Sequence, residues 1–319
     1  MSVSVQQTWS KLLPAVEDEL LSSATNGTFT DTVYYLYSQR LKNGKISKPR
    51  PVYANSRVMR ATASYFIAQL SGEFSTSHKI SAETQHYEYD SDSDLDDFDG
   101  DLDGLNSDNT PLENVWDGME GKGKEIARNA SMNPNETERS ETTAESSQST
   151  AMDIKYQIFI PDVAARTWQA LVVWAHTGLL QFAPLKSAGL PAVEQEKSPE
   201  QFLTRLPMCS PKPLYRLADI VGMERLKNKA FAELESQVTS RTVTHEMFSN
   251  FSSMYRDVLK MQLSFAFSED TLQTIMPEIM KNIRPIVQGE MPHSEQVLSA
   301  LLSKLKETTI LLASGQFHR

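Results

Sequence analysis

The sequence has a single cysteine, Cys209, among its 319 residues. One cysteine excludes a disulfide within the chain and any zinc site that needs several thiolates, and it is typical of a reducing compartment. Long apolar runs are also missing, because none approaches the roughly 18 consecutive apolar residues that a membrane-spanning helix needs. The first residues, MSVSVQQTWSKLL, lack the basic start and the apolar stretch of a secretory signal. The sequence therefore predicts a cytoplasmic or nuclear protein with no membrane partner.

Catalytic and cofactor-binding motifs are missing as well. The sequence contains no phosphate-binding loop, no Gly-x-Ser-x-Gly, no protein-kinase motifs and no dinucleotide fingerprint. The histidines show no metal-ligand spacing, and Cys209 has no sequence neighbour that would stabilise a thiolate. The run from Asp99 to Gly104 matches the first half of a calcium loop, but the twelfth position is Thr110, where a bidentate Glu is needed. We predict no enzymatic activity, no cofactor and no metal site.

Basic residues are scarce in one part of the chain. Residues 83–153 hold 20 Asp and Glu against 4 Lys and Arg, and few apolar side chains. Such a segment cannot offset the entropy lost on ordering, so we predict a disordered, acidic, Ser/Thr-rich insertion over residues 81–153. Ser91 and Ser93 are each followed three residues later by an aspartate and are candidate phosphosites. The rest of the chain has only a small, scattered basic excess, which argues against direct binding to nucleic acid.

Outside the insertion, the hydrophobic pattern predicts strands. Residues 31–39 are rich in aromatic and β-branched residues, and Asn43-Gly44 is a hairpin signal before a second extended segment at residues 51–54. These two segments are therefore expected to pair as antiparallel strands. Beyond the insertion, YQIFI at residues 156–160 is typical of a buried strand.

Apolar residues at helical spacing predict the remaining elements. Asn55 or Ser56 is placed to cap a first short helix and Ser64 a second, and a longer helix is expected over residues 164–175. Two further helices are predicted over residues 213–221 and 224–238.

The predicted fold class is α+β with an all-α C-terminal extension. Its five parts are an N-terminal helical segment (1–30), the first half of the mixed domain (31–80), the insertion (81–153), the second half (154–240) and the helical extension (241–319).

Motifs in both halves of the mixed domain resemble the BTB/POZ interaction domain. The first half matches at Val52, Ala54, Val58, Met59, Ser64, Tyr65, Phe66, Gly72 and Phe74. The second half matches at Pro161, Asp162, Thr177, Gly178, Leu214, Ala218, Asp219, Val221, Met223 and Leu226. The runs Phe182-Ala183-Pro184-Leu185 and Cys209-Ser210-Pro211-Lys212 are similar to a subgroup abundant in filamentous and mushroom-forming fungi. The resemblance implies a BTB/POZ fold that is split by the insertion, with residues 31–39, 51–54 and 156–160 in one sheet over one core. Such an interruption of a single domain is tolerated because loop-closure entropy grows slowly with length.

The resemblance also implies self-association. BTB domains generally pair as twofold dimers through an N-terminal helix and the first helices of the domain, which corresponds here to Trp9, Leu13, Asp31, Asn55 and Arg57. In the family a buried Asp accompanies a basic residue; Asp31 matches the Asp, but Ser56 stands at the basic position. Either Arg57 supplies the counter-charge, or Asp31 caps a strand or turn. The N-terminal helix, expected within residues 8–23, either contributes to the dimer or covers its own domain.

Recruitment of other proteins is the second implication of the resemblance. Family members that bind cullin scaffolds of ubiquitin ligases use the surface around the helix before Tyr-Thr-Gly, and Trp168 and His176 are the matching candidates here. The function implied is non-enzymatic: homodimerisation and partner recruitment, with a cullin as one candidate partner. An alternative is a nuclear, transcription-associated scaffold that acts through the acidic insertion.

Overall fold

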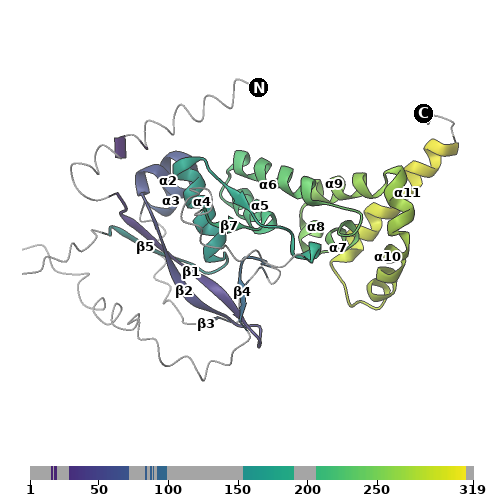
Figure 1. The fold of residues 1–319 in the computed structure, drawn as a ribbon, viewed down its shortest axis with the longest axis horizontal. Helices are drawn as coiled ribbons and strands as arrows, with labels where there is room; N and C mark the ends of the chain where they lie inside the picture. The colour runs from purple at the N-terminus through teal and green to yellow at the C-terminus, as the bar shows by residue number, and fades with distance from the viewer. Residues whose placement is uncertain are drawn as a thin grey trace, which may run out of the picture. The chain divides into compact units, whose positions relative to one another are not determined.

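A computed structural model (Figure 1) describes residues 29–71, 83–84, 87, 89, 92–98, 154–189 and 206–313, together with residues 16, 18 and 19. Within these ranges, the side chains of residues 83–84, 97–98, 269–270 and 311–313 are not described. The described residues form a mixed α+β protein with a small central sheet, a separate pair of short strands and a series of helices.

The central sheet is built on a long hairpin. β1 (Thr32–Leu41) pairs with β2 (Ile46–Ala54) in antiparallel register. Gly44 in the turn adopts a left-handed conformation (φ 78°), which agrees with the Asn-Gly hairpin signal. β5 (Tyr156–Ile160) lies parallel to β1, with Tyr156 opposite Thr32. The prediction that strands from both sides of the acidic tract share one sheet is therefore confirmed.

The start of the acidic tract is folded, so the prediction of disorder from residue 81 onward is wrong for this part. β3 (Glu83–Thr84) pairs with β2, and β4 (Asp96–Phe98) lies parallel to the end of β1. Three side chains of the tract are buried in the main core: Tyr87, Tyr89 and Leu95. Composition averaged over the whole tract concealed them, because the acidic residues around them dominate the average. For residues 99–152 the prediction lies outside the described residues.

Two short helices follow β2 directly. The side-chain oxygen of Asn55 accepts hydrogen bonds from the backbone N–H groups of Arg57 and Val58, and so caps α2 (Ser56–Thr62) as predicted. Ala63 is extended between α2 and α3 (Ser64–Gln69). Ala63, and not Ser64, is the residue that precedes α3, and no side chain caps that helix.

The main core lies between the sheet and α4 (Ala165–Thr177), which packs against β1, β2 and α2. The Trp168 ring is at its centre, with ring centroids 4.9 Å from Tyr34 of β1 and 6.1 Å from Phe66 of α3. α4 ends where Gly178 takes the left-handed conformation (φ 69°), and the Gly178 N–H donates to the carbonyl of Trp174.

The second half of the mixed domain continues with short strands and two helices. β6 (Gln181–Phe182) pairs in parallel with β7 (Met208–Cys209), and a single 3₁₀ turn, η3 (Lys186–Ala188), follows β6. α5 (Pro211–Ile220) and α6 (Glu224–Gln237) pack against each other, as the sequence predicted within one or two residues at most boundaries.

The C-terminal part of the described chain is helical, as predicted. Its helices are α7 (Val243–Met247), α8 (Asn250–Met254), α9 (Arg256–Ala266), α10 (Glu269–Val287) and α11 (Ser294–Ala313). They enclose a second cluster of buried side chains, which includes Val243, Met247 and Ile275. Phe251 of α8 and the adjacent Tyr255 contact Tyr215 of α5, so α8 also packs on the main core.

Candidate functional site

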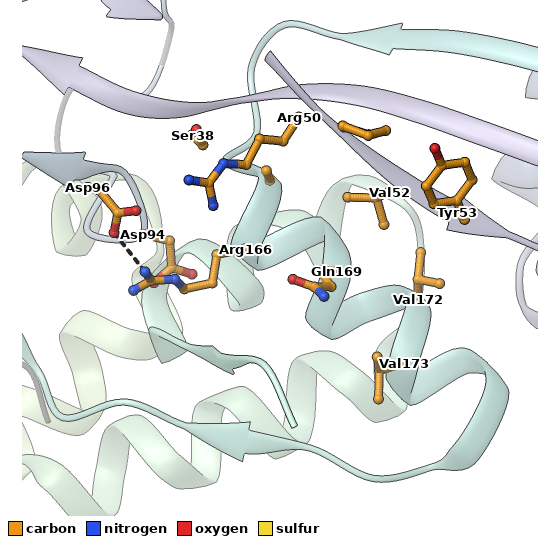
Figure 2. A pocket seen from close by; sticks show the side chains of 12 residues that line it. Ser38, Arg50, Val52, Tyr53, Asp94, Asp96, Arg166, Gln169, Val172 and Val173 are labelled. Carbon is orange, nitrogen blue, oxygen red and sulfur yellow. Dashed lines mark hydrogen bonds and ion pairs between the residues drawn. The ribbon is translucent and has the colours of Figure 1, made fainter. Parts of the chain in front are cut away.

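A groove of about 480 Å³ lies between β2 and α4 (Figure 2). Its lining is polar at one end and apolar at the other, as Figure 2 shows. The polar side chains are Ser38, Arg50, Asp94, Asp96, Arg166 and Gln169. The apolar side chains include Val52, Val172 and Val173; Tyr53 also borders the groove, but it is adjacent to Val52 on β2, so its side chain lies on the other face of the strand. A groove with this division is suited to a ligand that carries both a charged group and an apolar group.

Regular backbone periodicities place these side chains together. Arg50 and Val52 are two residues apart on β2, so they lie on the same face of the strand. Arg166, Gln169 and Val173 are spaced by three and four residues on α4, so they form one stripe along that helix. The stripe borders the buried face that packs on the sheet, and the two walls of the groove are therefore the sheet and this side of α4.

Two arginines reach into the polar end of the groove from facing walls (Figure 2). Arg166 on α4 forms an ion pair with Asp96 of β4, with 2.7 Å between Nη2 and Oδ1. Arg50 on β2 is exposed and forms no ion pair with any residue that the structure describes. Arg50 is thus available to a negatively charged group from outside.

A buried carboxylate, Asp94, lies behind the polar end of the groove. One carboxylate oxygen accepts a hydrogen bond from the hydroxyl of Thr167 on α4 (2.7 Å), and the other accepts one from the backbone N–H of Ser210, just before α5 (2.7 Å). Burial and the nearby Asp92 carboxylate raise the pKa of Asp94 to about 7. Asp94 therefore attaches the acidic tract to two helices of the domain.

Asp92 supports the same segment. Its carboxylate accepts hydrogen bonds from the hydroxyl of Tyr87 (2.6 Å) and from the backbone N–H of Asp94 (2.9 Å), while Arg40 donates to its carbonyl (3.3 Å). Burial raises the pKa of Asp92 above its ordinary value. Ser93, one of the two candidate phosphosites, is partly exposed between these aspartates, and Ser91 lies outside the described residues.

Asp31 caps a backbone and does not pair with Arg57. Its carboxylate accepts hydrogen bonds from the N–H (2.7 Å) and the hydroxyl (2.6 Å) of Ser56 at the start of α2. The Arg57 guanidinium instead donates to Glu19 (3.0 Å). Of the two alternatives for Asp31, the structure therefore supports capping, and Arg57 is not its counter-charge.

Asn55 and His176 join the start of α2 to the end of α4. The Asn55 N–H donates to Nε2 of His176 (3.3 Å), so that nitrogen is an acceptor and the ring is neutral. The other ring nitrogen, Nδ1, then donates to the carbonyl of Val172 (2.7 Å). Burial lowers the pKa of His176, which is consistent with the neutral ring. Both ring nitrogens of His176 are thus engaged inside the domain, while the ring remains partly exposed, so its place on the partner face stays a prediction.

The prediction for Trp168 requires a correction. Its side chain is only 1% exposed, so it cannot contact a partner, and the prediction that placed it on the partner face is wrong. The exposed residues of α4 are Arg166, Gln169 and Thr177. Trp9 and Leu13, like Gly72, Phe74 and the partial calcium loop from Asp99 to Gly104, lie outside the described residues.

The described residues offer little support for metal or thiol chemistry. No cluster of three or more His, Cys, Asp or Glu among them could hold a metal ion. Cys209 is fully buried, and burial, together with the nearby Asp94, raises the pKa of its thiol well above the usual value. None of the helices in the described part of the chain is long and apolar enough to cross a membrane.

Sequence reasoning missed the residues that matter most in the groove, Arg50, Arg166 and Asp94. The arginines are far apart in the sequence and belong to no motif. Asp94 looks like any other member of an acidic run, although the tyrosines and the leucine around it were an available signal of burial.

A scan against protein-family models and a search of curated proteins find no match to this chain. Fold and site together define a mixed α+β protein with a charged and apolar groove at the side of its sheet.

Proposed function

We propose that the chain is a non-enzymatic protein-interaction module of the BTB/POZ type. The observation that carries the proposal is the sheet: β5, from beyond the acidic tract, pairs in parallel with β1, which also pairs with the antiparallel β2. The resemblance predicted that these strands would form one sheet. The order of helices that follows, α4 and then the α5–α6 pair, also supports it.

The arrangement of polar groups favours binding over catalysis. Asp94 has a raised pKa and borders a groove, which is a combination often found in active sites. Both of its oxygens, however, already accept hydrogen bonds from Thr167 and Ser210, so its role is to hold the acidic segment in place.

Self-association is the first activity to test. Differently tagged copies of the full chain should copurify, and light scattering after gel filtration should give about twice the monomer mass of 35.8 kDa. Arg57 and Glu19 lie beside the capped start of α2, where the resemblance places the dimer contact. A monomer at all concentrations in the micromolar range would contradict homodimerisation.

Partner recruitment needs affinity purification under native conditions. The full chain should be compared with a variant in which residues 99–152 are replaced by a flexible linker, because residues 83–98 belong to the folded core. Partners kept by the variant bind the fold, as the proposal expects. Partners lost with residues 99–152 would favour the alternative, a nuclear scaffold that acts through the insertion.

A cullin is one candidate partner, and the structure changes how it should be tested. Val173 and Gln169 lie on the accessible stripe of α4, whereas Trp168 is in the core. Val173→Glu should therefore abolish copurification of a cullin while leaving the fold intact. Absence of any cullin from the wild-type purification would remove this partner.

A further inference from the structure

Of the two arginines in the groove, one has an ion-pair partner among the described residues and the other has none. Arg166 is paired with the carboxylate of Asp96, which is part of the acidic tract of this same chain. Arg50, which faces it from β2, has no carboxylate partner among the described residues (Figure 2). The groove thus already holds one carboxylate on one of its two cations and leaves the other cation open.

The apolar end of the groove is lined by Val52 of β2 and by Val172 and Val173 of α4. Val52 is on the same face of β2 as Arg50, and Val173 is the partly exposed member of this group. A ligand whose charged group is bound to Arg50 would therefore place an apolar group against Val52 and Val173.

We propose that the groove between β2 and α4 binds a short acidic peptide segment of a partner protein, through an Asp or Glu carboxylate on Arg50 and an apolar side chain on Val52 and Val173. The proposal rests on the proposed function, since it names the site and the chemistry of one partner of the interaction module. An arginine guanidinium suits a carboxylate because its N–H groups match both oxygens in one plane.

Charge balance favours a carboxylate over a phosphate group. The polar end contains Arg50 and Arg166 together with Asp96, which is paired with Arg166, and Asp94, whose two oxygens accept hydrogen bonds from Thr167 and Ser210. The net charge of this end is therefore at most one positive charge, and Arg50 is the cation without a carboxylate partner among the described residues, which matches a ligand with a single carboxylate. A phosphate carries about two negative charges and would be repelled by the Asp96 carboxylate at the same end.

The test uses the full chain and a panel of labelled eight-residue peptides. Each peptide carries one Glu and one Leu placed two, three or four residues apart, and each has a counterpart with Gln in place of Glu and one with phosphoserine in that place. Binding is followed by fluorescence anisotropy. At least one Glu peptide should bind, and its Gln counterpart should bind about tenfold more weakly or worse, because a charge-assisted hydrogen bond is lost.

Variants of the protein then locate the site. Arg50→Gln should weaken binding of the Glu peptide about tenfold, because the remaining cation is already paired. Val173→Asp should weaken it through the apolar end. Arg256→Gln is the matched control, since Arg256 is an exposed arginine on α9 outside the groove, and it should leave the affinity unchanged.

Several outcomes would overturn the proposal. These are no binding by any Glu peptide, equal binding by Gln peptides, no effect of Arg50→Gln, or binding by phosphoserine peptides alone, which would identify a phosphate site. Self-association and partner purification of the wild-type chain test the proposed function separately. If the wild-type chain self-associates and binds partners, only the proposal about the groove is wrong. If it does neither, the proposed function is wrong as well.

Discussion

Asp31 joins the beginning of β1 to the beginning of α2 through its side chain. Asp31→Ala removes the acceptor for the N–H and the hydroxyl of Ser56 and for the hydroxyl of Thr32. We expect the free energy of unfolding to fall by about 1–3 kcal/mol, because partly buried donors are left without a partner. Urea denaturation followed by circular dichroism measures the change.

Arg57→Ala is the comparison for Asp31. The Arg57 side chain is 60% exposed, and its ion pairs are with Asp18 and Glu19 at the surface. Its removal should cost about 0–1 kcal/mol. A larger loss for Arg57→Ala than for Asp31→Ala would mean that Arg57 is the important charge after all.

Asp94 gives the domain a stability that depends on pH. Its pKa is raised from 3.8 to about 7, so the folded state favours the protonated form. The stabilisation is fully present below pH 3.8 and is lost as the pH rises through about 7. As the pH rises from 5 to 8, the free energy of unfolding should therefore fall less in Asp94→Asn than in wild type. The midpoints of urea denaturation measure this difference.

The change in Asp94→Asn must be separated from other titrations. The pKa of Asp92 is also raised, so its effect on stability changes with pH in the same direction as that of Asp94. The pKa of His176 is lowered, so its effect is opposite: its stabilisation is lost as the pH falls below 6.5. Both groups remain in the variant, so the difference between the two curves belongs to Asp94 and to its effect on Asp92. Parallel curves for variant and wild type would show that Asp94 does not titrate in this range.

For single residues, the sequence predicted roles that depend on neighbours in the sequence, but not roles that depend on residues far apart in the chain. The capping role of Asn55 follows from its position before a helical run, and the sequence predicted it. Which face of α4 is buried depends on what packs against it, and Trp168 was placed on the wrong face for that reason. Arg50 and Arg166 come together only when β2 and α4 pack, so no local pattern marks them.

The elements themselves were largely predictable where hydrophobic periodicity was strong. β1, β5 and α4 follow alternating or helical patterns of apolar residues over five residues or more, and the structure has them close to the predicted bounds. β3 and β4 have two and three residues, which is too short for a pattern, and they lie within an acidic composition. β3 and β4 are extended because they pair with β2 and β1, and the sequence of one short segment does not show which strand it pairs with.

Residues 92–98 form the element whose attachment can be tested directly. Asp94 binds the N–H of Ser210, next to the only cysteine of the chain, Cys209, which is fully buried. Leu95→Asp places a charge in the core and should detach this segment. We expect the Cys209 thiol to react with a maleimide about tenfold faster or more, because a rare local opening becomes a populated one.

The control for this experiment is a charge at an exposed leucine. Leu302→Asp on α11, where the side chain is 57% exposed, should leave the rate of the thiol reaction unchanged. Far-ultraviolet circular dichroism must show that both variants remain folded. An unchanged rate in Leu95→Asp would mean that residues 92–98 do not protect Cys209.

At the scale of the whole molecule, the strand by which the chain leaves the sheet and the strand by which it returns both pair with β1. β4 pairs with β1 from Gln39 to Leu41, and β5 pairs with β1 from Thr32 to Leu36, both in parallel. Residues 99–152 therefore connect the end of one parallel strand to the beginning of another. The span along β1 from residue 41 back to residue 32 is roughly 30 Å at about 3.3 Å per residue. At least about nine extended residues are needed to cover it.

This geometry predicts which parts of the acidic tract can be removed. Replacing residues 99–152 with a 20-residue Gly/Ser linker leaves enough length for the return and shortens the loop. The free energy of unfolding should stay within about 1 kcal/mol of wild type, because closure entropy changes only logarithmically with loop length. Replacing residues 83–153 with the same linker removes β3, β4 and the buried Tyr87, Tyr89 and Leu95. Each buried aromatic or leucine side chain contributes about 2–5 kcal/mol. That variant should therefore lose cooperative unfolding in a urea titration, and equal stability of the two variants would place the whole tract outside the core.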